Sequence, residues 1–437
     1  MDIFKKIKGT IDLYNNDYLL VNKIIKRIKK LLDLYGYTPI ITPSIENKKI
    51  LKKNILNNKK IIYYINNNKF LIYDLTIPLI RFLKDNYNNI IFPFKRYQIQ
   101  KVWRGENPQN YRYREFYQLD IDIISFKKDN NYYPELELIT LCDKIFKKIK
   151  IKGIFNFNNK NILYGLCQIF NVKKNNWENF LRLLDKINKL NINKILILLI
   201  KKNIIKKKYK DIFLKLYKIN NLTKNKKKII YFKNFFFKYK NKNGINGIKF
   251  LIKIYKKILK INFINLNINI NFLLSRGLNY YKTIIFEIYK KSNNKLISLL
   301  GGGRYDNYIK INKKKTYYIG MSLGIYRIYN FFKSNKKLFV LSKKQIYLLF
   351  INLNIEYNIY NKYTNILRKY NIKTEIFPYY EKVKKQIKYA NKKNINLLIF
   401  LGKNEIKNNI IKLKKINENK EYIFKNIRKL ILYLKKL

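Results

Sequence analysis

Histidine is absent from this chain of 437 residues, and cysteine is nearly so. Without histidine, the chain has no Ser-His or Cys-His nucleophile pair and no histidine general base. The two cysteines, Cys142 and Cys167, are too few and too far apart for a thiolate zinc cluster. Any catalysis must therefore use arginine, aspartate, glutamate, lysine, glutamine or tyrosine, together with metal ions that need no Cys or His ligand.

Long apolar runs are also missing. The segment ILILLI at 195–200 is ended by Lys201 and Lys202, so it is far too short to span a membrane. The N-terminus has neither the apolar core nor the small-residue cleavage site of a secretory signal. We therefore expect a cytosolic protein with no membrane partner. The hydrophobic content of 47% allows a large core, and the length predicts two or three domains.

Acidic residues are scarce. There are 26 of them against 95 lysines and arginines, which gives a formal net charge of +69. Such a charge ordinarily indicates nucleic-acid binding. However, lysine, asparagine, isoleucine, tyrosine and phenylalanine crowd the chain and Ala390 is its one alanine, as expected from a very AT-rich coding sequence. The charge therefore permits RNA binding, since lysines raise nonspecific affinity for phosphates, but it does not locate an interface.

The most informative stretch runs from Val102 to Ile123 and predicts two strands around a basic loop. After the loop, polar and apolar residues alternate with period two, which is typical of a strand with two different faces. Before it, Arg104 follows the strand just ahead of Gly105 and Pro108, which turn the chain. A cation at the rim of a polar pocket, beside carboxylates, is one interpretation, and an ordinary hairpin with one solvated face is the other. The residues on the polar side are Gln98, Gln100, Arg104, Arg114, Gln118, Asp120 and Asp122.

Other candidate side chains lie near the ends of expected strands and helices. In FLIYDLTIPLIRFLKDN at 70–86, Asp74 and Thr76 stand where a strand runs into a helix and would by themselves indicate only a helix cap. The glycine run at 301–303, followed by Arg304, indicates a flexible segment beside a cation. It matches neither GxxxxGK[ST] nor GxGxxG, so no P-loop or Rossmann site is predicted.

Several segments together resemble the class II aminoacyl-tRNA synthetases, and specifically the histidyl-tRNA synthetase family. They occur in the family's order and cover nearly the whole chain apart from a middle segment. SRGLNYY at 275–281 is similar to the family's histidine-specific RGLDYY segment. The other matching segments are YGYTPIITPSIE at 35–46, DLT at 74–76, the hairpin from Val102 to Ile123, and SLGIYRI at 322–328.

The resemblance implies an α+β fold. It consists of a class II antiparallel-sheet catalytic domain with a helical insertion and a C-terminal α/β anticodon-binding domain, and YGYTPIITPSIE implies a homodimer interface. From the residues alone, strands and helices alternate after about 338, with one further strand and a last helix after the strand at 396–402. The expected domains are residues 1–150 and 266–335 for the catalytic part, 151–265 for the insertion and 336–437 for the anticodon-binding domain.

The resemblance also implies roles. Arg104 and Arg276 are the expected catalytic residues, because guanidinium groups can take up the negative charge that develops on the α-phosphate when a carboxylate attacks it. Arg327 is the expected contact to the γ-phosphate. ATP is the expected substrate, with Mg²⁺. L-Histidine is expected to bind Asp74, Thr76 and Gln118 through its ammonium group, Asp122 through a ring N–H, and Tyr280 and Tyr281 through the ring.

The chain departs from the family pattern at two positions. Asn279 stands where the family has aspartate, and Tyr326 stands where it has an acid. Three alternatives remain open on these residues: a regulatory subunit of ATP phosphoribosyltransferase, a decayed RNA-binding protein without activity, and a synthetase for another amino acid. The α/β pattern at the C-terminus speaks against the first, the retained arginines and aspartates against the second, and SRGLNYY against the third. The predicted function is therefore histidine–tRNA ligase, with histidine tRNA as partner.

Overall fold

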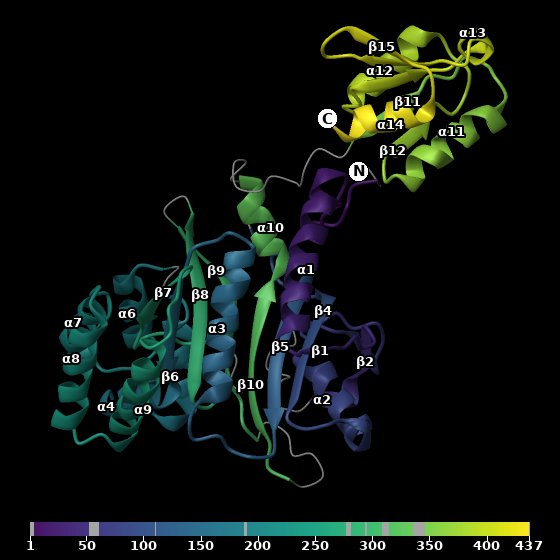
Figure 1. Cartoon of the computed structure of the whole chain (residues 1–437). Coiled ribbons are helices and arrows are strands. Elements are labelled where there is room, and N and C mark those ends of the chain that lie inside the picture. Colours follow the sequence, from purple (N-terminus) through teal and green to yellow (C-terminus); the bar gives the residue numbers. More distant parts are fainter. Residues whose placement is uncertain are drawn as a thin grey trace. The chain divides into compact units, whose positions relative to one another are not determined.

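The computed structural model describes residues 4–51, 61–109, 111–187, 190–276, 281–292, 295–307, 314–334 and 346–436. The chain forms two compact units, Met1–Phe339 and Val340–Leu437. Each unit has its own sheet and its own hydrophobic core (Figure 1). None of the helices in the described residues combines the length and the apolar composition that a membrane crossing requires.

One large sheet organises the first unit. In the described residues it has eight strands in the order β1-β4-β5-β10-β9-β8-β6-β7. Neighbouring strands are antiparallel except for the parallel pairs β1–β4 and β6–β7 at its two edges. The strands are β1 (Thr38–Pro39), β4 (Phe94–Trp103), β5 (Glu115–Ser125), β6 (Gly153–Asn159), β7 (Leu266–Ile270), β8 (Ile284–Ser292), β9 (Lys295–Arg304) and β10 (Tyr317–Gly324).

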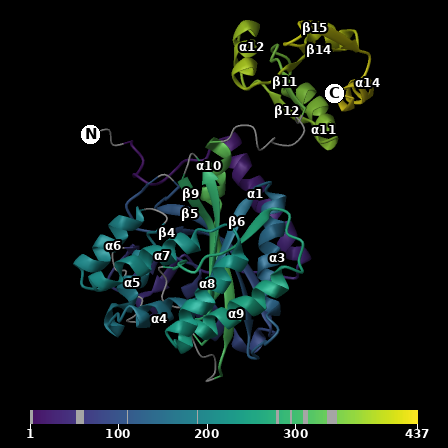
Figure 2. The same cartoon turned by 90° about the vertical axis from the view of Figure 1, so that its left-hand side faces the viewer.

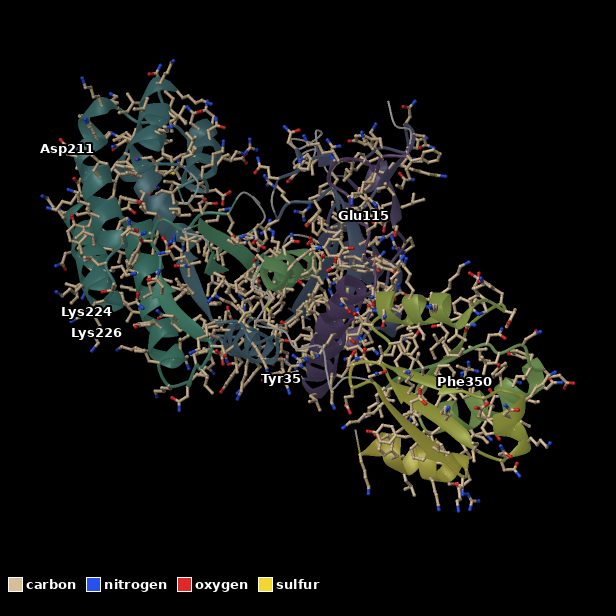
Figure 3. The ribbon with its side chains drawn as sticks, turned by 90° about the horizontal axis from the view of Figure 1, so that it is seen from above. Tyr35, Glu115, Asp211, Lys224, Lys226 and Phe350 are labelled. Atoms are coloured by element: carbon tan, nitrogen blue, oxygen red, sulfur yellow. The ribbon has the colours of Figure 1, made fainter. Side chains whose placement is uncertain are left out.

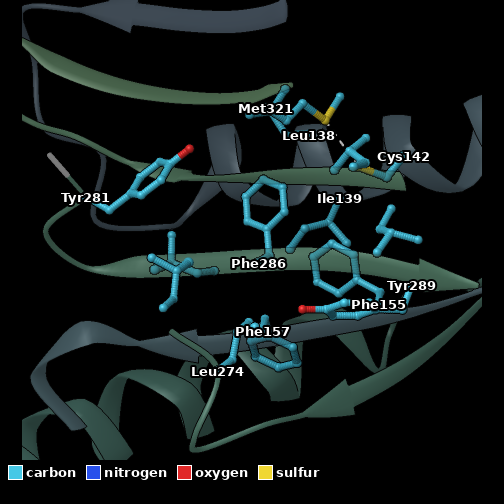
Figure 4. Close-up of a cluster of buried hydrophobic side chains, with 14 of the residues drawn as sticks. Leu138, Ile139, Cys142, Phe155, Phe157, Leu274, Tyr281, Phe286, Tyr289 and Met321 are labelled. Atoms are coloured by element: carbon cyan, nitrogen blue, oxygen red, sulfur yellow. Dashed lines mark hydrogen bonds between the residues drawn. The ribbon is translucent and has the colours of Figure 1, made fainter. Parts of the chain in front are cut away.

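Helices α1 (Asn16–Leu34), α3 (Tyr133–Lys148) and α10 (Ile325–Ser334) pack on one another and on one face of this sheet (Figure 1). Helix α1 buries Val21, Ile24, Ile28, Leu31 and Leu32, whose three- and four-residue spacing forms one apolar stripe. Figure 4 shows the same core further along the sheet, where side chains of α3 lie against aromatic residues of β6 and β8. Side chains alternate between the two faces of a strand. Each strand that packs against these helices on one face therefore presents its other side chains on the opposite face of the sheet.

A short two-stranded sheet lies in the same unit, between β1 and β4 in the chain. It leads into the helix that carries the DLT segment (residues 74–76) at its start. Asp74 accepts a hydrogen bond from the Ile77 amide at 3.2 Å, so it also satisfies a backbone donor of the first helical turn. The elements are β2 (Ile45–Asn47), η1 (Lys48–Ile50), β3 (Lys69–Leu71), α2 (Thr76–Asp85) and η3 (Tyr87–Asn89).

Between β6 and β7, the described residues form six helices in a separate layer, which Figure 2 views from its outer side. Helices α4 and α9 come close at Gly165 and Gly244, where an added Cβ on Gly165 would lie 2.9 Å from the Gly244 nitrogen. Lys224 and Lys226 are exposed here (Figure 3), as are many other lysines, so positive charge is spread over the helices. The helices are α4 (Lys160–Ile169), α5 (Trp177–Leu184), α6 (Ile192–Lys201), α7 (Lys210–Asn220), α8 (Asn225–Lys238) and α9 (Lys242–Ile258), with η4 (Lys174–Asn176) and η5 (Lys207–Tyr209) between them.

The first residues of the segment predicted as insertion, 151–265, are not helical. Residues Gly153–Asn159 form β6, which pairs with β8 and β7 inside the large sheet. Phe155 and Phe157 alternate with asparagines and pack into the core, which is a strand pattern and not a helical one. The helical part therefore starts at Lys160. The domain limits as a whole remain a prediction.

The second unit is an α/β sandwich around a mixed sheet of order β12-β11-β13-β14-β15. Its two faces bury separate apolar clusters, one around Tyr360 and Leu430 and one around Ala390, so both faces are covered. After β13, the structure has two strands where the sequence pattern suggested one, because Asn419 has a positive φ and turns the chain into a hairpin. The elements are β11 (Tyr347–Phe350), α11 (Tyr357–Lys369), β12 (Lys373–Ile376), α12 (Val383–Lys392), β13 (Leu397–Phe400), α13 (Lys403–Lys407), β14 (Ile411–Lys415), β15 (Lys420–Phe424) and α14 (Ile427–Lys435).

Candidate active site

The β4–β5 hairpin is present as predicted, but its polar side is not solvated. Gln118, Asp120 and Asp122 expose only 4%, 3% and 4% of their surface. On the other side of β5, Leu119 and Ile121 are equally buried in the helix-covered core. The solvated-hairpin interpretation is therefore wrong. We call the side of the sheet that carries Gln98, Gln118, Asp120 and Asp122 the polar face.

Three carboxyl groups gather on the polar face. Asp120 and Asp122 project from β5, and Asp74 from the DLT segment interacts electrostatically with Asp120. The pKa of Asp74 is raised to about 6, mainly by burial, with the backbone N–H of Ile77 acting against the rise and the Asp120 charge adding to it. Burial also raises the pKa of Asp122 to about 6, with the neighbouring Arg96 guanidinium acting in the opposite direction. The cluster is therefore a place where a bound cation would be stabilised.

Asp122 already has two partners. Its Oδ2 lies 2.6 Å from Nη2 of Arg96, and its Oδ1 accepts a hydrogen bond from the Tyr305 hydroxyl. Gly320 of β10 makes room for this carboxylate, because a Cβ there would lie 1.8 Å from Oδ1. An ionised carboxylate has about four lone-pair sites, so Asp122 keeps the capacity to accept one more N–H.

Arg104 connects the carboxyl cluster to the loop of the hairpin. Its Nε donates to the Tyr73 carbonyl at 2.9 Å, and its Nη2 donates to Oε1 of Gln118 at 2.9 Å. Gln118 in turn donates from Nε2 to Oδ1 of Asp120 at 2.8 Å. Arg104 is thus fixed in direction by two hydrogen bonds.

Arg276 lies over the glycine run of β9. Its Nη1 is 3.6 Å from Oε1 of Glu287, and its guanidinium carbon is 5.8 Å from the centre of the Tyr281 ring. A Cβ on Gly301 would lie 1.5 Å from that Nη1, and one on Gly303 would lie 2.7 Å from the Tyr281 ring. The glycine run is therefore a regular strand that leaves space for functional side chains, and the expectation of a flexible segment is wrong.

The arginine that follows the glycine run has a structural role. Arg304 is buried, and its Nε donates to Oε1 of Glu135 on α3 at 2.8 Å, while its Nη1 lies 3.1 Å from Asp306. It therefore belongs to the helix-covered side of β9.

Further arginines gather around Arg327 on α10. Arg327 donates from Nη1 to the Ser298 carbonyl at 2.7 Å. Its pKa is lowered to about 10, mainly by burial and also by repulsion from Arg104, Arg112 and Arg276, while Glu287 acts in the opposite direction. A small cleft lies between Arg104, Arg112 and Arg327, with Phe116 and Tyr326 in its walls. Arginines that repel one another around a cleft are the arrangement expected of a polyanion site.

The remaining predicted ligands fall in different places. Thr76 is buried at the start of α2 beside the carboxyl cluster. Tyr281 is buried, and its ring meets that of Tyr305 edge-on, with the ring centres 6.3 Å apart. Because the Tyr305 hydroxyl donates to Asp122, Tyr281 is linked indirectly to that carboxylate. Tyr280 and Asn279 lie outside the described residues.

Three residues of the site were missed by sequence reasoning: Arg96, Tyr305 and Arg112. Arg96 had a usable signal, because the alternation that places Gln98 and Gln100 on the polar face extends one step further back to Arg96. The hairpin register pairs Arg96 with Asp122. Tyr305 follows Arg304 from a strand far away in the chain, so nothing local indicates its contact.

No group of three or more cysteine, aspartate, glutamate or histidine side chains in the described ranges is arranged to hold a metal ion. Both cysteines are buried free thiols whose pKa is raised by burial. They are parts of the core.

Comparison with known proteins identifies the family of this chain. The model of the histidyl-tRNA synthetase family matches residues 9–328, and that of the anticodon binding domain matches residues 345–437. The chain belongs to the histidyl-tRNA synthetase family. The histidine–tRNA ligase of Azobacteroides pseudotrichonymphae is 31% identical over 93% of each chain. That of Finegoldia magna is 31% identical over 95% of this chain and 96% of its own. The predicted family and the predicted enzyme, a histidine–tRNA ligase, are confirmed.

Solved structures give the same fold. The histidyl-tRNA synthetase of Nostoc sp. PCC 7120 has a TM-score of 0.76 at 22% identity, covering 99% of both chains. A structure from Bacillus halodurans C, named as an ATP phosphoribosyltransferase regulatory subunit/histidyl-tRNA synthetase, has a TM-score of 0.68 at 16% identity, covering 92% of this chain. The class II synthetase fold is therefore confirmed. The match of residues 345–437 to the anticodon binding domain favours the synthetase over the regulatory alternative.

Proposed function

We propose that the polar face is where L-histidine and ATP meet, and that histidyl-adenylate forms there before histidine passes to the 3′ end of histidine tRNA. The observation that carries this proposal is the adjacency of two opposite electrostatic sites. A carboxyl cluster suited to an ammonium group lies beside an arginine cluster suited to a polyphosphate, and the hydrogen-bonded chain from Arg104 through Gln118 to Asp120 joins them.

The arginines carry the phosphate chemistry in this proposal. The histidine carboxylate attacks the α-phosphorus, the bond to the bridging oxygen breaks, and pyrophosphate leaves with the electron pair. Arg104 and Arg276 take up the negative charge that develops on the α-phosphate oxygens. Arg327 holds the far end of the triphosphate. No general base is required because the attacking carboxylate is already ionised, so a chain without histidine is able to perform this step.

The carboxyl cluster orients the amino acid. Asp74, Thr76 and Gln118 accept hydrogen bonds from the ammonium group, and Asp122 accepts one from a ring N–H of the imidazole, with Tyr281 beside the ring. An amino acid without that N–H leaves the buried Asp122 without its ligand, which is a strong basis for rejection.

Magnesium is part of the proposal as a companion of ATP. Tyr326 occupies the position where the family has an acid, and Glu287 is already paired with Ser298, Tyr289 and Arg276. These residues fit an ion that keeps its waters and is held mainly by phosphate oxygens, as is common for Mg²⁺. Its contribution is to neutralise charge on the phosphates.

We further propose a homodimer that works on tRNA in the cytosol. The segment that resembles the dimer motif leaves Ile41 80% exposed and Ile45 50% exposed, which is unusual for large apolar side chains near a sheet edge. The C-terminal unit supplies the anticodon contact in this proposal, on the strength of its family match.

The test is ATP–pyrophosphate exchange by the purified protein with each of the twenty amino acids. We expect exchange with histidine alone. Exchange with a different amino acid would show that this amino acid, and not histidine, is the substrate. No exchange at all would favour the regulatory or RNA-binding alternative.

A further inference from the structure

Arg96 links two parts of the proposed histidine site, although no contact with histidine or ATP is expected of it. It is completely buried on β4. Its Nη2 lies 2.6 Å from Oδ2 of Asp122 and donates to the Leu75 carbonyl at 3.4 Å. Leu75 is the middle residue of the DLT segment. A single guanidinium therefore joins the proposed imidazole acceptor to the proposed ammonium-binding segment.

A row of polar side chains fixes Arg96 from the other side. Its Nη1 donates to Oε1 of Gln98 at 3.2 Å. Gln98 donates from Nε2 to Oγ1 of Thr42 at 2.9 Å and to Oε1 of Gln100 at 2.8 Å. Gln100 donates to the Thr42 carbonyl at 2.7 Å. Because these groups hold one another, Arg96 has little freedom to turn away from Asp122.

The charges on the polar face also require Arg96. Asp74, Asp120 and Asp122 bring three carboxyl groups together, and Arg96 and Arg104 are the guanidinium groups that act on them. With Arg96 in place, the charge of Asp122 is balanced before any ligand binds. The excess negative charge is then left near Asp74 and Asp120, where the histidine ammonium group is expected.

We propose that Arg96 is a positioning and specificity residue for histidine. It keeps the Asp122 carboxylate ionised and aimed at the ring, and its charge disfavours a protonated imidazole, so the site selects the neutral ring with one N–H donated to Asp122. This inference rests on the proposed function. It assigns Arg96 no contact with ATP, and so it predicts an effect on histidine alone.

The experiment measures exchange kinetics of the full chain for Arg96→Lys and Arg96→Gln. Arg81→Gln is the matched control, since Arg81 also pairs with a buried carboxylate, Glu46, at 2.9 Å, but not with the carboxyl cluster. We expect Arg96→Gln to raise the KM for histidine at least about 10-fold, the size of a lost hydrogen bond to a charged group, and to leave the KM for ATP unchanged. Arg96→Lys keeps the charge and is expected to recover part of this loss. Arg81→Gln should alter neither KM.

A competitor separates positioning from general damage. β-(2-Thienyl)alanine has a ring of similar size but no ring N–H, so its inhibition constant should change less than the KM for histidine in Arg96→Gln. Equal changes would overturn the proposal, as would an unchanged KM for histidine or a parallel rise in both KM values. If Arg96→Gln does not fold, Arg96→Lys decides by the same criteria. Absence of exchange in the unmodified protein would instead overturn the proposed function, and this inference with it.

Discussion

The two sides of β5 are buried to the same degree and have opposite chemistry. Leu119, Ile121 and Ile123 lie in the helix-covered core, where α10 packs against β5, whereas Gln118, Asp120 and Asp122 face the polar side. Burying each aliphatic side chain stabilises the fold by about 1.5–3 kcal/mol. Burying each carboxylate costs free energy, which is why the pKa of Asp122 is raised to about 6. One side of the strand therefore holds the fold together, and the other is maintained for ligands.

The largest effect that we expect comes from a substitution on the polar side. Arg276→Ala should lower histidine-dependent exchange by about 1000-fold, because it removes a charge that stabilises the transition state. Thermal unfolding should change little, since Arg276 lies outside the helix-covered core. Arg182→Ala, which removes an exposed arginine paired with Glu178 on α5, is the control and should leave exchange intact. Exchange by Arg276→Ala close to the unmodified rate would remove Arg276 from the mechanism.

Two adjacent glycines sharpen the comparison because they face opposite sides of β9. A Cβ on Gly301 would lie 1.5 Å from Arg276, whereas one on Gly302 would lie 2.5 Å from the Phe286 ring and 2.4 Å from the Gly320 carbonyl oxygen. Gly301→Ala should therefore lower kcat about 100-fold by displacing the guanidinium. Gly302→Ala should instead lower the free energy of unfolding by about 1–3 kcal/mol. Equal loss of kcat in both folded variants would contradict the division of the strand.

Smaller effects are expected from substitutions at two positions on opposite sides of β5. Gln118→Ala breaks the link between Arg104 and Asp120 and should raise the KM for histidine about 10-fold. Ile121→Ala should leave that KM unchanged but lower the free energy of unfolding by about 2–5 kcal/mol, because it opens a cavity in the core. Denaturant titration and exchange kinetics on the same preparations measure both quantities. An Ile121→Ala variant with normal stability would count against the core assignment.

The smallest expected effect is the response to pH. Asp74 and Asp122, each with a pKa raised to about 6, lose their charge as the pH falls through 6, so kcat/KM for histidine should decline there. The facing charged groups are Asp120, Arg96 and Arg104. Because both pKa values lie above the ordinary value, these two groups stabilise the ligand-free fold increasingly as the pH falls from about 6 to 4. Protonation of the substrate imidazole overlaps this range, and Asp122→Asn separates the two contributions.

Most of the fold was predictable because its signals are local. The alternation in the hairpin, the apolar stripe of α1 and the strand–helix pattern of the second unit all lie within short segments. The asparagine-rich strand β6 was missed because its side chains resemble the adjoining helical segment in composition, and its partner β8 lies over a hundred residues away. Within the site, Arg104 and Asp122 were indicated by one hairpin. Tyr305 and the role of Gly301 depend on β9 lying near β5 and Arg276, which no local pattern reveals.

The central claim is tested most directly by charging of a histidine tRNA transcript with labelled histidine by the purified, unmodified chain. The account predicts histidine attached to the 3′ end in an ATP-dependent reaction that Arg276→Ala slows by about 1000-fold, as it slows exchange. Histidine-dependent pyrophosphate exchange without any transfer to tRNA would contradict the ligase assignment while leaving the activation chemistry intact. Failure of both reactions would contradict the account of the polar face itself.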